Sequence, residues 1–89
     1  ATEERTNAIG YRIADLTEQL AEAVESGNYT DEQLSDVRRL ARDAQFYWDF
    51  VFVENSEGAH NSTLTNDCLD RAESLCEEAF AALSAVVNT

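Results

Sequence analysis

The sequence predicts an all-α protein, an antiparallel up-down-up three-helix bundle with a long second helix. The 89 residues include no proline and only three glycines, so little in the composition interrupts a helix. Apolar residues also recur at steps of three and four in three stretches, which are separated by polar breaks. We therefore expect one helical domain over residues 1–89, with helices at about 2–26, 31–56 and 63–87.

The first predicted helix has one apolar stripe. The stripe is formed by Ile9, Ile13, Leu16, Leu20 and Val24. Gly27 followed by Asn28 is typical of a left-handed C-cap, so we expect this helix to end near Ser26.

The second predicted helix begins with a capping box. The Thr30 hydroxyl is expected to accept a hydrogen bond from the backbone N–H of Gln33, whose side chain reaches back to residue 30, while Tyr29 is placed to pack on Leu34. The helix continues with a stripe of Leu34, Val37, Ala41, Ala44, Trp48 and Val51. Because the connection to the first helix is short, we expect these two helices to pack antiparallel.

An aromatic segment, residues 46–53, ends the second predicted helix. It reads Phe-Tyr-Trp-Asp-Phe-Val-Phe-Val and is apolar on nearly every side, which is typical of a helix covered on every side. In a three-helix bundle one side of this segment stays exposed to solvent, so several solvent-accessible rings would indicate a missing partner. The candidate interface residues are Phe46, Trp48, Phe50 and Phe52. Burial of the Asp49 carboxylate in such an apolar run costs free energy unless the carboxylate is paired. The possible partners are Arg12, Arg42 or a group of the missing partner.

The third predicted helix follows a polar stretch that contains Gly58, with Ser62 or Thr65 as its N-cap. Its broad apolar face comprises Leu64, Cys68, Leu69, Ala72, Leu75, Cys76, Ala79, Phe80, Leu83 and Val87. Eight residues along one helix separate the two cysteine Cα atoms by about 12 Å, beyond the reach of a disulfide. We therefore expect free thiols in the core, and the spacing excludes the Cys-x-x-Cys-His motif that attaches a c-type haem.

Charge and residue types exclude several functions. Eighteen acidic residues stand against six arginines and no lysine, for a net charge of −12, so binding to nucleic acid or insertion into a membrane is not expected. With one histidine and no glycine-rich loop, the chain alone holds no catalytic residues, and we expect no enzyme activity from it. Glu57 and His60 form a single Glu-x-x-His half-site, whereas di-iron bundles need two, so no metal site is expected.

Residues 42–61 carry a resemblance to a known family. Ala44 to Phe50 reads Ala-Gln-Phe-Tyr-Trp-Asp-Phe, and Gly58, His60 and Asn61 follow. This stretch resembles the C-terminal helical region of ammonia-forming cytochrome c nitrite reductases, in which an Ala-Gln-aromatic-x-Trp-Asp-Phe helix precedes a turn with Gly and His-Asn-Pro. Ser62 stands where that family has proline.

The resemblance implies that the chain is a fragment of a larger periplasmic or extracytoplasmic multihaem cytochrome that reduces nitrite to ammonia with six electrons. In that family the helical tail carries no haem, packs against the haem core and contributes to a homodimer. The haem c of the parent, its haem-bearing remainder and a second copy are thus the implied cofactor and partners. The position of His60 matches a distal haem ligand.

A free-standing acidic helical module that binds another protein through the aromatic segment is the alternative interpretation. Cys-x-x-Cys-His repeats upstream in the parent gene would favour the cytochrome, whereas a reading frame that begins near residue 1 would favour the module. The missing initiator methionine and the early start of the first helix lead us to expect a piece of a longer protein.

Overall fold

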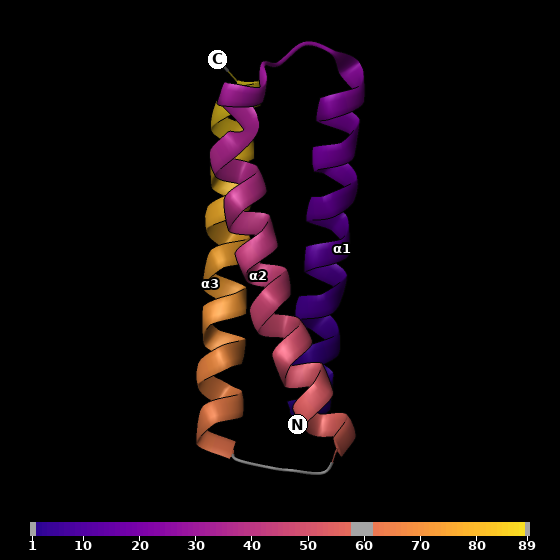
Figure 1. Cartoon of the computed structure of the whole chain (residues 1–89), viewed down its shortest axis with the longest axis vertical. Helices are drawn as coiled ribbons and strands as arrows, with labels where there is room; N and C mark the ends of the chain where they lie inside the picture. The colour runs from indigo at the N-terminus through magenta and orange to yellow at the C-terminus, as the bar shows by residue number, and fades with distance from the viewer. Residues whose placement is uncertain (1, 58–61, 89) are drawn as a thin grey trace.

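The computed structural model describes residues 2–57 and 62–88, which form an elongated bundle of 44 × 18 × 18 Å (Figure 1). The helices are α1 (Thr2–Ser26), α2 (Asp31–Glu57) and α3 (Ser62–Val87), and these residues contain no strand. The all-α prediction of an up-down-up bundle with a long second helix is therefore confirmed. The helix ends lie within one residue of the expected ones.

The start of α3 differs from the expectation. Ser62 is already its first helical residue, and Thr65 is a buried residue of its first turn, so Thr65 is not the N-cap. Ser62, Thr63 and Thr65 carry hydroxyl side chains in close succession, and the short-range pattern alone does not select the N-cap among them.

The core is built from the predicted apolar stripes of all three helices. Its fully buried centre comprises Leu16, Leu34, Val37, Val51, Leu69 and Cys76. On α1 the expected apolar stripe departs from the core near the C-terminal end of the helix, where Ala23 is buried in place of Val24, which is exposed. Seven residues bring Ala23 back to within about 20° of Leu16, whereas eight turn Val24 about 80° away. Leu64 and Val87, near the ends of α3, are likewise exposed, contrary to expectation.

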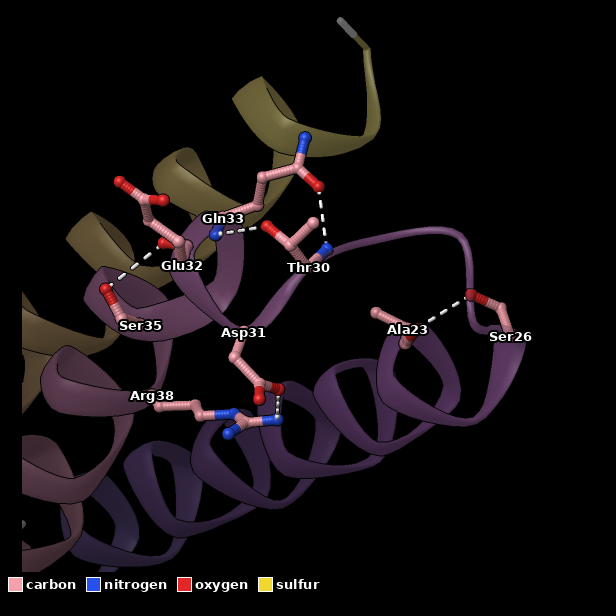
Figure 2. A network of polar contacts seen from close by, with 8 residues as sticks. All are labelled: Ala23, Ser26, Thr30, Asp31, Glu32, Gln33, Ser35 and Arg38. Carbon is pink, nitrogen blue, oxygen red and sulfur yellow. Dashed lines mark hydrogen bonds and ion pairs between the residues drawn. The ribbon is translucent and has the colours of Figure 1, made fainter.

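The connection between α1 and α2 has the predicted capping structure (Figure 2). Gly27 adopts a φ of +71°, and its N–H donates to the Val24 carbonyl, which ends α1. The Gln33 N–H donates to the Thr30 hydroxyl over 3.1 Å, and the Thr30 N–H donates to the Gln33 side-chain oxygen over 2.8 Å. The capping box is thus confirmed.

The three helices are not packed equally. α2 lies along α3 more extensively than either lies along α1, and the expected antiparallel packing of α2 on α1 is present as the smaller contact. Ion pairs connect α1 to α3. Arg5 binds Asp70 and Glu73, and the Arg12 guanidinium binds Glu77 at 2.7 Å. Among the described helices, none combines the length and the hydropathy that a membrane crossing needs.

Candidate functional site

The aromatic segment of α2 is largely exposed. The side chains of Phe46 and Phe52 are 64% and 54% exposed, Phe50 is also exposed, and Val51 is fully buried. The expectation that one side of this segment stays exposed to solvent in a three-helix bundle, with several accessible rings, is therefore confirmed. A long amphipathic helix at the edge of a three-helix bundle can bury one face only.

The exposed residues form two groups on α2. Phe46, Phe50 and Val53 follow one another at steps of four and three, which places them along a single stripe of the helix surface. We call these three residues the outer stripe. Phe52 lies on another side of the helix, where its ring stacks on Trp48 with centroids 5.4 Å apart and 23° between the planes.

Trp48 connects α2 to α1. Its indole N–H donates to the Thr6 carbonyl over 2.7 Å, and the indole is half-buried. Gly10 makes room for the ring, because a Cβ atom at that position would lie 2.8 Å from Cζ2 of Trp48. Sequence reasoning missed Gly10, although a glycine inside a helical pattern is a signal of close approach by another group. Trp48 therefore has a role inside the bundle, unlike the three phenylalanines of the candidate interface.

Asp49 lies on the exposed surface of α2 and accepts a hydrogen bond of 2.8 Å from the Gln45 side chain. The predicted pairing with Arg12 is wrong, because Arg12 binds Glu77 and its guanidinium lies 4.1 Å from the centre of the Phe80 ring. Because Asp49 is exposed, its carboxylate is accessible to water and needs no charged partner within this chain.

The two cysteines are free thiols in the core, as predicted. Burial raises the pKa of the Cys68 thiol, and the carboxylates of Asp67 and Glu54 add to this effect. Burial likewise raises the pKa of the Cys76 thiol. Both groups are thus held as neutral thiols, which are poor nucleophiles and poor metal ligands.

The predicted haem ligand, His60, lies outside the described residues, as does the half-site that it forms with Glu57. Within residues 2–57 and 62–88, no cluster of three or more histidine, cysteine or carboxylate side chains is arranged to hold a metal ion.

Comparison with known proteins identifies the family. The family model described as cytochrome c552 matches residues 1–89. The chain belongs to the cytochrome c552 family. Among curated proteins, this family member is similar to cytochrome c nitrite reductase subunit NrfA of Nitratidesulfovibrio vulgaris (strain Hildenborough), with 34% identity over 50 residues. The match covers 56% of the chain and about a tenth, 10%, of that relative. No solved structure matches the chain.

Membership of the cytochrome c552 family implies a c-type haem in the parent protein. Covalent attachment of such a haem requires two neighbouring cysteine sulfurs in a Cys-x-x-Cys-His motif. Cys68 and Cys76 do not fit this chemistry, because both lie in the core between the helices and are eight positions apart. The exposed rings of α2 are therefore the feature of the described chain that best fits contact with a larger body.

Proposed function

We propose that this chain is the C-terminal helical domain of a nitrite-reductase-like multihaem cytochrome c, whose parent reduces nitrite to ammonia with six electrons. The family match over residues 1–89 and the relative that is named a cytochrome c nitrite reductase subunit support the proposal. Because the sequence has no Cys-x-x-Cys-His motif, the haem groups and the catalytic chemistry belong to the remainder of the parent. The proposed location is the periplasm or another extracytoplasmic compartment.

The exposure of the outer stripe carries the proposal. Phe46, Phe50 and Val53 present apolar surface to water along one line of the helix. Complete burial of a fully exposed side chain of this size gains about 1.5–3 kcal/mol, and burial of the remaining exposed part of each gains roughly half of that. In the proposed parent this stripe packs against the haem-bearing remainder and contributes to a homodimer. Phe52 and the exposed part of Trp48 provide a second apolar surface for the remainder of the parent, on another side of α2.

His60 is proposed as a distal ligand to one haem of the parent. A neutral imidazole binds haem iron readily, and His60 stands three residues after Glu57, the last residue of α2. The test is His60→Ala in the intact parent, with the optical and electron paramagnetic resonance signals of the haems as the readout. We expect the low-spin signal of one haem to change. Unaltered spectra in the fully loaded protein would exclude the ligand role.

The first test of the domain role is the parent gene, which should encode Cys-x-x-Cys-His motifs upstream of residue 1. A gene without them would favour the alternative, a free-standing module that binds a protein through the aromatic segment.

The second test is Phe46→Glu in the parent, with Tyr11→Glu as the matched control, because Tyr11 is also a highly exposed ring but lies on α1. We expect Phe46→Glu to reduce the yield of haem-loaded, dimeric protein in sedimentation experiments, while Tyr11→Glu leaves the yield unchanged. Equal effects of the two substitutions would contradict a specific role of the outer stripe.

A further inference from the structure

A groove separates the C-terminal halves of α1 and α3, at the end of the bundle opposite the aromatic segment. Its volume is about 820 Å³, and its apolar lining consists of Ala23, Tyr29, Phe80, Leu83 and Val87. Figure 1 shows α1 standing apart from α2 and α3 toward this end, where the α1–α2 connection crosses. Along α1 the lining extends from Arg12 to Ser26, which is about 21 Å of helix.

The rim of this groove is electronegative. The C-termini of α1 and α3 lie at this end, and neither helix has a basic residue in its last turn to offset the negative end of its dipole. Glu22 lines the groove. In the first turn of α2, at the same end of the bundle, Glu32 adds a further carboxylate, whereas Asp31 is paired with Arg38 at 3.6 Å. The charge of Arg12, at the inner end of the lining, is already matched by Glu77.

We propose that this groove binds a basic amphipathic helix of a separate protein. The apolar floor matches the apolar stripe of such a helix, and the acidic rim matches lysine or arginine side chains beside that stripe. The lining spans about 21 Å along α1 and about 12 Å along α3, from Phe80 to Asn88, so the groove accommodates roughly two to four turns of a fourth helix on the open side of the bundle. A second copy of the chain is a poor occupant of this groove, because the sequence has no lysine and only six arginines and so offers no basic amphipathic helix. The inference does not depend on the proposed function.

The test uses a labelled peptide of about 14 residues, with leucines on one face and lysines on the other, long enough for roughly four turns. Binding to the 89-residue chain is measured by fluorescence anisotropy at low salt. Val87→Lys is expected to weaken binding about tenfold, because it places a charge on the groove floor and repels the lysines. The control is Leu64→Lys, which places the same charge at a comparably exposed position (43% against 50% for Val87) near the other end of α3, and it should leave the affinity unchanged.

A second pair of variants tests the rim. Glu22→Gln is expected to weaken binding about two- to fivefold, while Glu18→Gln, one turn away on α1 and outside the lining, has no effect. Far-UV circular dichroism verifies that each variant is folded. The proposal is overturned if the peptide does not bind, if a glutamate version of it binds equally well, or if Leu64→Lys weakens binding as much as Val87→Lys. Sedimentation that shows a dimer sensitive to Val87→Lys would also overturn it, in favour of a second copy.

Discussion

Replacing Gly10 by alanine is the most direct test of how α1 docks on α2. In a helix interior this substitution ordinarily stabilises a protein by about 1 kcal/mol. Here the added Cβ atom would lie 2.8 Å from Cζ2 and 3.0 Å from Cε2 of Trp48. The indole is not free to yield, because its N–H donates to the Thr6 carbonyl and its ring stacks on Phe52.

The expected net effect of Gly10→Ala is a loss of stability. Displacing the indole sacrifices a hydrogen bond worth about 1 kcal/mol, and overpacking costs about 1–3 kcal/mol. After subtraction of the gain in helix propensity, the free energy of unfolding should fall by about 1–3 kcal/mol, measured by urea denaturation followed by far-UV circular dichroism. Ala14→Gly, at an exposed position of the same helix, measures the propensity contribution alone and should cost about 1 kcal/mol.

The reasoning is refuted if Gly10→Ala gains about as much stability as Ala14→Gly loses, roughly 1 kcal/mol. That result would mean that the indole moves aside without cost. In a Trp48→Phe background the smaller ring removes the close contact, so Gly10→Ala should there become neutral or stabilising. A penalty that persists in this background would point to a cause other than the Trp48 ring.

Three further predictions concern the caps, the thiols and the ion pairs. Thr30→Ala should lower the free energy of unfolding by about 1 kcal/mol in urea denaturation, and equal losses for Thr30→Ser, which keeps the hydroxyl, would contradict a capping role. Because burial raises the pKa of the Cys76 thiol, the folded chain keeps a proton that the unfolded chain releases near its ordinary pKa of about 8.5. The contribution of this thiol to the free energy of unfolding should therefore be fully present below about pH 8.5 and decrease as the pH rises toward the folded-state pKa. Cys76→Ala should reduce this decrease in denaturation curves measured at several pH values, and an unchanged dependence on pH would contradict the role of Cys76. Glu77→Gln should lower the free energy of unfolding by at most about 1 kcal/mol, because the ion pair with Arg12 is exposed to solvent. If this decrease in stability persists in about 1 M NaCl, charge attraction is excluded as its origin.

Local interactions account for what the sequence predicted well. The capping box of Thr30 and Gln33 involves residues three apart, and Gly27 requires only its own φ, so neighbouring residues suffice to predict both. The three apolar stripes likewise follow from helical periodicity. The same reasoning placed Val24 in the core, because steps of four accumulate an angular error that the sequence alone does not reveal.

Contacts between residues distant in the chain could not be predicted in the same way. The approach of Trp48 to Gly10 and the pairing of Arg12 with Glu77 depend on how the helices are turned about their axes. Asp49 was assigned a buried environment because its neighbours in sequence are apolar, whereas helical geometry places it on the exposed surface. The groove between α1 and α3 depends on where these two helices separate, which periodicity does not describe.

The unequal packing of the three helices has a consequence for the motions of the bundle. Because α1 has the smaller contact with the α2–α3 pair, the opening of lowest free energy is the release of α1, and its amides should exchange with solvent sooner than those of α2 and α3. When α1 is released, the indole of Trp48 loses its hydrogen bond to the Thr6 carbonyl and its contact with α1 at Gly10. The single tryptophan of the chain is therefore a built-in fluorescent reporter of α1 release, distinct from global unfolding.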